Sequence, residues 1–177
     1  MTIAFKTQVA HERLSRQDRI GQQLHLLDEQ GDVAISFVEC IQHNLGLDLR
    51  KNQVRRDVVG IVRKFADFHW KTDTLVCVAL TIRHPAMMSL LDLLVEHLAT
   101  MADRPLTPKE LLAALPITNR ERLRWTKDKR LKRSGDVKIK PGQIVTIATY
   151  SVSATESILA DRAILDRWRE ADRLAKA

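Results

Sequence analysis

Apolar residues recur at helical spacing along much of the chain, in blocks separated by glycine, proline or short polar stretches. After a short extended piece at residues 2–9, the spacing from Leu14 to Leu27 predicts a helix that ends at Gly31. Residues 33–45 repeat this spacing and predict a second helix. The periodicity of the first part of the chain therefore predicts a helical domain.

Three more apolar segments come next along the chain. Residues 53–70 predict a third amphipathic helix, whose basic face is either solvated or a secondary contact for phosphates. The β-branched run 74–82 is short enough for a buried strand or for a turn of buried helix. Residues 86–101 predict a helix whose polar side chains form only one narrow stripe. Such a helix must be covered nearly all round, so we expect it at the centre of the N-terminal domain or in the seam of a homodimer.

The polar stretch Asp103-Arg104-Pro105 is the best domain boundary in the sequence, because the residues after it differ in character from those before it. We assign residues 1–103 to a helical domain for self-association or partner binding. Residues 104–177 form the second predicted domain, which carries the most informative motifs.

Two helix-start signals stand close together after this boundary. Thr107 and Glu110 flank Pro108 in the pattern of a capping box, where both side chains satisfy backbone N–H groups at a helix start. A proline ends this helix, and Thr118 and Glu121 then repeat the box. Two short helices joined so tightly predict a helix-turn-helix geometry.

A hairpin is predicted directly after the second helix. Residues 137–140 and 143–150 are two β-like runs around a Pro-Gly turn, with alternating faces. Placed there, the hairpin would be a wing. Residues 153–174 then predict one amphipathic helix, with Ser153 as its cap and Glu156 as the box partner. The predicted fold class is mainly α with a small β-hairpin wing, an N-terminal helical domain being followed by a winged helix-turn-helix.

The order of these motifs resembles a known family. L-T-P-K-E-L, then R-W-x-K-D-x-R-L, then a Gly-containing hairpin resembles the winged helix-turn-helix of excisionase-like and MerR-like DNA-binding domains, over residues 106–150. In that family the second helix enters the major groove and the wing contacts the neighbouring backbone or minor groove. The resemblance implies a groove-facing end at residues 119–124 and a wing at residues 132–140. Lys129 and Pro116 stand where the family commonly has glycine.

Positive charge is concentrated in the same stretch. Residues 118–140 hold ten Lys or Arg against three Asp or Glu, a local excess of seven that equals the formal net charge of the whole chain, +7. A focused positive field of this kind suits a polyanion such as nucleic acid, because binding phosphates releases condensed counterions.

The N-terminal end of the second helix carries the reading residues in a helix-turn-helix. We expect Leu123 to turn inward with Trp125 or Thr126, and Trp125 to belong to the core rather than to a stacking platform. Asn119 is suited to adenine, and the arginines are suited to guanine, in the major groove. The predicted nucleic-acid-binding residues are Asn119, Arg120, Arg122, Arg124, Lys127, Lys129, Arg130, Lys132, Arg133, Lys138 and Lys140.

The sequence thus predicts a sequence-specific protein for double-stranded DNA, in transcriptional control or as an accessory factor in recombination, replication or plasmid maintenance. Two alternatives use the same basic segment: an RNA-binding protein, which the sparse aromatic residues disfavour, and a non-catalytic adaptor that docks an acidic partner. We expect no enzyme, because the sequence has no nucleophile elbow, phosphate-binding glycine loop or dinucleotide fingerprint.

Cysteine usage and hydropathy set the remaining expectations. Cys40 and Cys77 lie in apolar runs without a CxxC motif, which favours buried free thiols in a reducing compartment and no metal or cofactor. No apolar run has the length of a signal peptide core or a membrane span. We therefore expect a cytoplasmic protein without a membrane partner.

Overall fold

The computed structural model describes residues 15–29, 32–79, 84–138 and 146–175. The predicted extended piece at residues 2–9 lies outside them. The chain divides into two compact units, Met1–Ala102 and Asp103–Ala177. No helix in the described part of the chain has the length and apolar character needed to cross a membrane.

The described residues of the first unit contain an antiparallel sheet in the order β1-β2-β4-β3. Its strands are β1 (His25–Glu29), β2 (Asp32–Ser36), β3 (Phe68–Thr72) and β4 (Leu75–Ala79). Ile35 pairs with Val76 across the two central strands, and both side chains are fully buried. Cross-strand packing of β-branched side chains of this kind is what stabilises a sheet.

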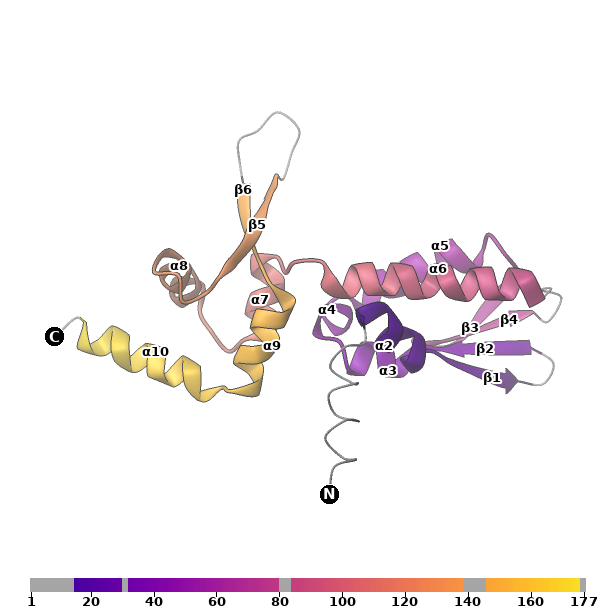
Figure 1. Cartoon of the computed structure of the whole chain (residues 1–177), viewed down its shortest axis with the longest axis horizontal. Coiled ribbons are helices and arrows are strands. Elements are labelled where there is room, and N and C mark those ends of the chain that lie inside the picture. Colours follow the sequence, from indigo (N-terminus) through magenta and orange to yellow (C-terminus); the bar gives the residue numbers. More distant parts are fainter. Residues whose placement is uncertain (1–14, 30–31, 80–83, 139–145, 176–177) are drawn as a thin grey trace, which may run out of the picture. The chain divides into compact units, whose positions relative to one another are not determined.

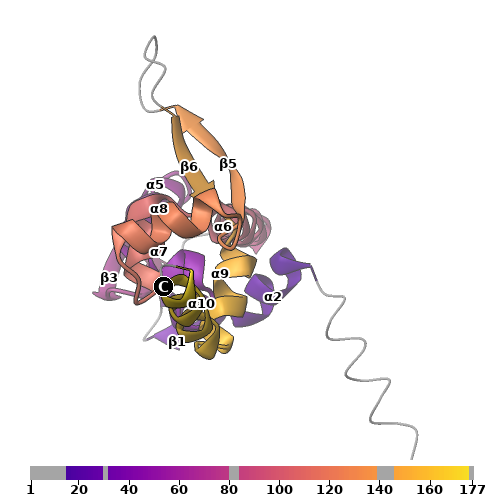
Figure 2. The ribbon, with the colours of Figure 1, turned by 90° about the vertical axis from the view of Figure 1, so that its left-hand side faces the viewer.

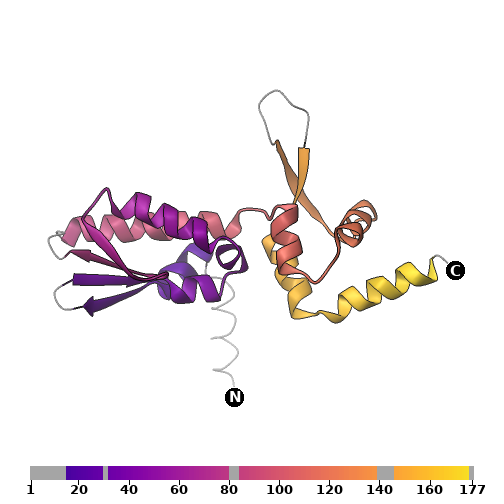
Figure 3. The same cartoon turned by 180° about the vertical axis from the view of Figure 1, so that it is seen from behind.

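The helices of the described part of this unit share one hydrophobic core with the sheet. They are α2 (Arg16–Gln23), α3 (Val38–Gln42), α4 (Leu45–Asp48), α5 (Lys51–Val62) and α6 (His84–Asp103). Figures 1 and 3 show α5 and α6 on the same side of the sheet. Both helices contribute buried residues at intervals of four to the core of the unit: Val54, Val58, Val62, Leu90, Leu94 and Leu98.

The prediction of a mainly helical protein is confirmed for the described residues, but the N-terminal domain also contains a four-stranded sheet that the predicted helices did not include. Residues 33–36, placed in the second predicted helix, belong to β2, and residues 68–70, the end of the third, belong to β3. The predicted helix through Leu27 already ends at Gln23. Short apolar runs fit either period, and pairing with β4 decides the outcome. Of the two alternatives for residues 74–82, the strand is observed at residues 75–79.

Helix α6 buries its apolar side in its own unit. Leu90, Leu94 and Leu98 are at most 2% exposed. The narrow polar stripe faces solvent: Ser89, Asp92, Glu96 and Thr100. Met88 and Leu93 of the same helix are 47% and 44% exposed. One side of α6 therefore belongs to the core of the N-terminal domain, and the seam of a homodimer stays a prediction.

Close packing fixes the C-terminal end of α6 against α4. A Cβ atom added to Gly46 would lie 2.4 Å from the carbonyl oxygen of Ala102, so only glycine fits there. Arg50 is 4% exposed and donates a hydrogen bond of 2.9 Å to the carbonyl of Met101.

Both predicted thiols are free and buried, and burial raises the pKa of Cys40 to about 12.

The second unit contains two short helices, an antiparallel hairpin and two further helices. In order they are α7 (Pro108–Ala114), α8 (Asn119–Lys127), β5 (Arg133–Lys138), β6 (Thr146–Tyr150), α9 (Val152–Ala160) and α10 (Ala163–Leu174). Leu106 and Tyr150 exchange backbone hydrogen bonds of 2.8 and 2.9 Å, which holds the start of the unit against the base of β6. Figure 2 shows the hairpin with α8 and α9 near its base.

Both predicted capping boxes are confirmed. Glu110 N donates to Thr107 Oγ1 over 3.3 Å, and Thr107 N donates to the Glu110 carboxylate over 2.7 Å. The corresponding distances for Thr118 and Glu121 are 3.1 and 2.7 Å. The hairpin is also confirmed, with Val137 opposite Ile147, while its predicted Pro-Gly turn lies outside the described residues.

The prediction of one final helix is wrong. Ser151, rather than Ser153, caps α9 by accepting a hydrogen bond from the N–H of Ala154. The helix ends at Asp161, whose φ of −122° and ψ of 76° are not helical, and α10 begins two residues later. The break carries neither glycine nor proline, so the usual sequence signal for a helix end is missing.

Candidate nucleic-acid interface

Helix α8 presents one face to solvent and buries the opposite one. Trp125 is fully buried, as predicted. With 3.6 residues per turn, the side opposite Trp125 carries four exposed side chains, which we call the outer face of α8. These residues are Asn119, Arg120, Leu123 and Lys127.

The predicted rotation of this helix is wrong in one respect. Leu123 does not turn inward as predicted, since its side chain is 55% exposed on the outer face. The large indole of Trp125 takes the buried position, and it lies about 160° around the helix from Leu123. Arg122 and Arg124 consequently lie on the two flanks of α8 instead of facing outward.

Arg124 and Arg130 are paired with acidic side chains inside the unit. Arg124 forms an ion pair with Asp172. Arg130 Nη2 lies 2.5 Å from Asp172 Oδ1, and the same guanidinium pairs with Asp128. It also donates to the backbone carbonyl of Trp168 over 3.0 Å. Both arginines therefore have acidic partners inside the unit, and their contact with nucleic acid stays a prediction.

The two tryptophans of the unit frame this cluster. Trp125 and Trp168 pack edge to face with ring centroids 5.0 Å apart. The Arg130 guanidinium lies 5.7 Å from one ring centroid and 5.9 Å from the other. Burial raises the pKa of Asp172, but hydrogen bonds from Arg130 and Trp125 outweigh it and hold that pKa below its usual range. The hydrogen bond to Asp128 is the main reason why the pKa of Arg130 is raised further.

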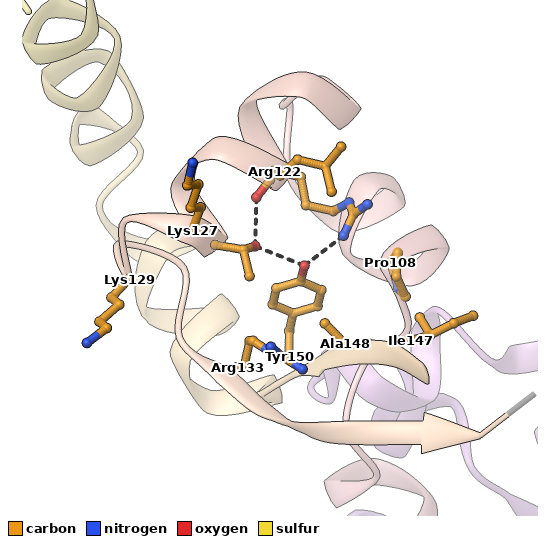
Figure 4. A pocket seen from close by; sticks show the side chains of 10 residues that line it. Pro108, Arg122, Lys127, Lys129, Arg133, Ile147, Ala148 and Tyr150 are labelled. Carbon is orange, nitrogen blue, oxygen red and sulfur yellow. Dashed lines mark hydrogen bonds between the residues drawn. The ribbon is translucent and has the colours of Figure 1, made fainter. Parts of the chain in front are cut away.

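Arg122, on the other flank, belongs to a hydrogen-bond network with the hairpin. Its Nη1 donates to the hydroxyl of Tyr150 over 2.8 Å, and that hydroxyl lies 3.0 Å from Thr126 Oγ1. Its Nε and Nη2 donate to Asn119 Oδ1 over 3.0 and 2.8 Å. Figure 4 shows the bonds that converge on the Tyr150 hydroxyl. The network fixes the position of α8 relative to β6.

A groove of about 830 Å³ lies between α8 and the hairpin, and we call it the basic groove. Four cationic side chains line it, and none of the described residues in its lining is acidic. Lys127 and Lys129 form no ion pair within the described residues. The lining comprises Pro108, Arg122, Leu123, Thr126, Lys127, Lys129, Arg133, Ile147, Ala148 and Tyr150 (Figure 4).

Lys129 has a φ of 66°, which is a left-handed conformation. This is the position where the resembled family commonly has glycine, the residue that adopts such angles at no steric cost. The turn after α8 thus has the backbone shape that glycine favours, and it places a lysine at the edge of the basic groove.

The remaining predicted residues are distributed unevenly. Arg133 lines the basic groove and pairs with Asp136. Lys132 is exposed beside a separate pocket between α9 and α10. Lys138 belongs to β5, but its side chain lies outside the described part of the structure, as does the whole of Lys140.

Sequence reasoning missed three residues that hold the arginines of the site. Tyr150 and Thr126 tie Arg122 in place, and Asp172 captures the two inner arginines. The i and i+4 spacing of Arg122 and Thr126 was a usable signal. The role of Asp172 had no local signal, because it lies 42 positions from Arg130.

Among the described residues, no group of three or more His, Cys, Asp or Glu side chains could hold a metal ion. No protein-family model matches this chain, and neither the curated proteins nor the solved structures include a match to it.

Proposed function

We propose that residues 104–177 form a winged helix-turn-helix that binds double-stranded DNA. The outer face of α8 enters the major groove, and the hairpin lies against the neighbouring backbone as the wing. The protein acts as a sequence-specific factor in transcriptional control or in recombination, replication or plasmid maintenance. The observation that carries this proposal is the basic groove, whose described lining has four cations and no acid.

The arrangement of charge supports binding to a phosphate backbone. Lys127 and Lys129 lie on exposed positions at the C-terminal end of α8, next to its outer face. Arg124 and Arg130 are paired with Asp172 and Asp128. Arg122, Lys127, Lys129 and Arg133 line the basic groove. Clustered cations on one face increase both the affinity for DNA and its salt dependence.

The aromatic residues support duplex DNA over single-stranded RNA. The second unit has three of them, Trp125, Tyr150 and Trp168. The first two are at most 1% exposed, and Trp168 is half-buried against Arg130. Recognition of single strands uses exposed aromatic rings on which bases stack. These three side chains are occupied in packing.

The test is a salt titration of duplex binding by fluorescence anisotropy with the full-length chain. Replacing Lys127 and Lys129 together by glutamine should lower the slope of log K against log salt by about two, because each phosphate contact contributes about 0.9. The matched control replaces Arg19 and Lys51, exposed on α2 and at the start of α5, by glutamine and removes the same charge from the first unit. Its slope should equal that of the unchanged protein.

Three results would contradict the proposal. Equal slopes for the two double variants would remove the basic groove from the interface. Tighter binding to single-stranded RNA than to duplex DNA would favour the RNA alternative. An absence of duplex binding even at about 50 mM salt, where electrostatic binding is strong, would favour docking of an acidic protein partner.

A further inference from the structure

The amide of Asn119 has a fixed orientation in this structure. Its Oδ1 accepts hydrogen bonds from both Nε and Nη2 of Arg122, over 3.0 and 2.8 Å. Two N–H donors can be satisfied only by the oxygen end of an amide, so the Nδ2 end points the other way. A carbonyl oxygen has two lone pairs, and both are occupied here.

Arg122 is itself held from its other end. Thr126 Oγ1 donates its proton to the backbone carbonyl of Arg122 over 2.6 Å, so it can only accept from Tyr150. The Tyr150 hydroxyl therefore donates to Thr126 and accepts from Arg122 Nη1 over 2.8 Å. Every hydrogen bond in this ring of three residues has a defined donor and acceptor, and Tyr150 is 1% exposed. Arg122 cannot move away from Asn119 without breaking its hydrogen bond to Tyr150.

We propose that Asn119 is a specificity-determining residue that presents only hydrogen-bond donors to DNA, and that it selects guanine or thymine at the base it meets. This inference rests on the proposed function, since it requires the outer face of α8 to lie in the major groove. An asparagine that recognises adenine must accept a hydrogen bond from N6 while it donates to N7. Asn119 has no free acceptor, whereas guanine O6 and N7 and thymine O4 require only a donor. The expectation that this asparagine is suited to adenine is replaced by the opposite preference.

The test is an unbiased selection of random duplex DNA by the full-length chain, with relative base preferences read at each position of the enriched site. The unchanged protein should prefer guanine or thymine by roughly tenfold at one position, the discrimination typical of a good contact. Asn119→Asp should reverse that position to cytosine or adenine, because a carboxylate offers only acceptors and keeps its partner Arg122. A carboxylate at a helix start also favours folding, so this variant leaves the unit intact.

A second variant frees the acceptor. Arg122→Leu releases Asn119 Oδ1 and should move the same position toward adenine. Arg162→Leu is the matched control, because it removes an exposed arginine of the same unit that has no hydrogen bond to Asn119 and lies outside the predicted interface, and the preference should stay unchanged. Circular dichroism and thermal unfolding verify the fold of each variant.

The outcomes separate this inference from the proposed function. Unchanged preferences in Asn119→Asp, or enrichment of adenine by the unchanged protein at the affected position, would overturn the inference while DNA binding stands. Salt-dependent duplex binding without an enriched sequence would also overturn the inference, because Asn119 would then not distinguish between bases. Failure to bind duplex DNA at all would overturn both.

Discussion

The carboxylate of Asp172 accepts a hydrogen bond of 2.9 Å from the indole nitrogen of Trp125. Trp125 is fully buried, so its N–H needs a partner within the protein. The same carboxylate pairs with Arg124 and Arg130, and it therefore joins α10 to α8. Two arginines of the basic segment thus stabilise the unit, whereas the outer face of α8 remains free for a ligand.

Asp172→Ala should destabilise the second unit by about 1 to 3 kcal/mol, because it leaves the buried indole N–H of Trp125 and the guanidinium of Arg124 without their carboxylate partner and removes one acceptor from Arg130. The Asp172 side chain is only 10% exposed. Asp166→Ala is the matched control on the same helix, since its side chain is 78% exposed and its pair with Arg169 is a surface ion pair. Urea unfolding should separate the two variants, and equal losses would contradict the role of Asp172.

Acid should unfold the second unit partly through Glu121. Burial raises the pKa of Glu121, but hydrogen bonds from Arg169 and Thr118 outweigh it and hold that pKa below its usual range. A lowered carboxylate pKa stabilises the folded state above the ordinary value of about 4.3, and this stability is lost as the pH falls through the folded value.

The measurement is the urea midpoint between about pH 7 and pH 2. Glu121→Gln should flatten the acid side of this profile, because glutamine completes the capping box without titrating. Glu170→Gln, at an exposed position of α10, is the control and should retain the profile of the unchanged protein. A Glu121→Gln profile as steep as that of the control would count against this role of Glu121.

Leu123→Ala should weaken DNA binding without destabilising the fold. The side chain is 55% exposed, so its removal should change stability by less than about 0.5 kcal/mol. In a major groove, an apolar side chain contacts the methyl group of thymine, and losing that contact should cost roughly 1 kcal/mol on the preferred site. Leu111→Ala, at a fully buried position, should instead cost about 2 to 5 kcal/mol of stability. A stability loss for Leu123→Ala as large as for Leu111→Ala would refute this assignment.

Lys129→Gly should stabilise the second unit and weaken DNA binding at the same time. The φ of 66° is strained for lysine and relaxed for glycine, so a gain of about 0.5 to 1 kcal/mol is expected from the turn. Loss of the charge should reduce the salt slope by about one. The comparison is Lys129→Gln, which removes the charge and keeps the strained backbone angle. Lys127→Gly is not suitable for this purpose, because Lys127 lies within α8. Parallel thermal unfolding and anisotropy would distinguish these effects, and an unstrained turn would give equal stability for both variants.

Local chemistry along the chain determined the elements around the site. The capping boxes at Thr107 and Thr118 depend on side chains three residues apart, and the hairpin depends on alternation around a turn. The concentration of charge in residues 118–140 is likewise a property of the sequence. These features could be predicted because each depends on neighbours within a few positions.

Tertiary structure decided the rest. The N-terminal sheet depends on pairing between β2 and β4, which lie about forty residues apart, and helical spacing in residues 33–36 could not reveal that partner. The side of α8 that faces solvent depends on which side chain the core accepts, and it accepted Trp125 in place of Leu123. Asp172 holds Arg124 and Arg130, and the Tyr150 hydroxyl holds Arg122. Folding brings these partners together from distant parts of the sequence. Periodicity shows that a residue lies on a helix face, but only long-range packing determines what that face meets.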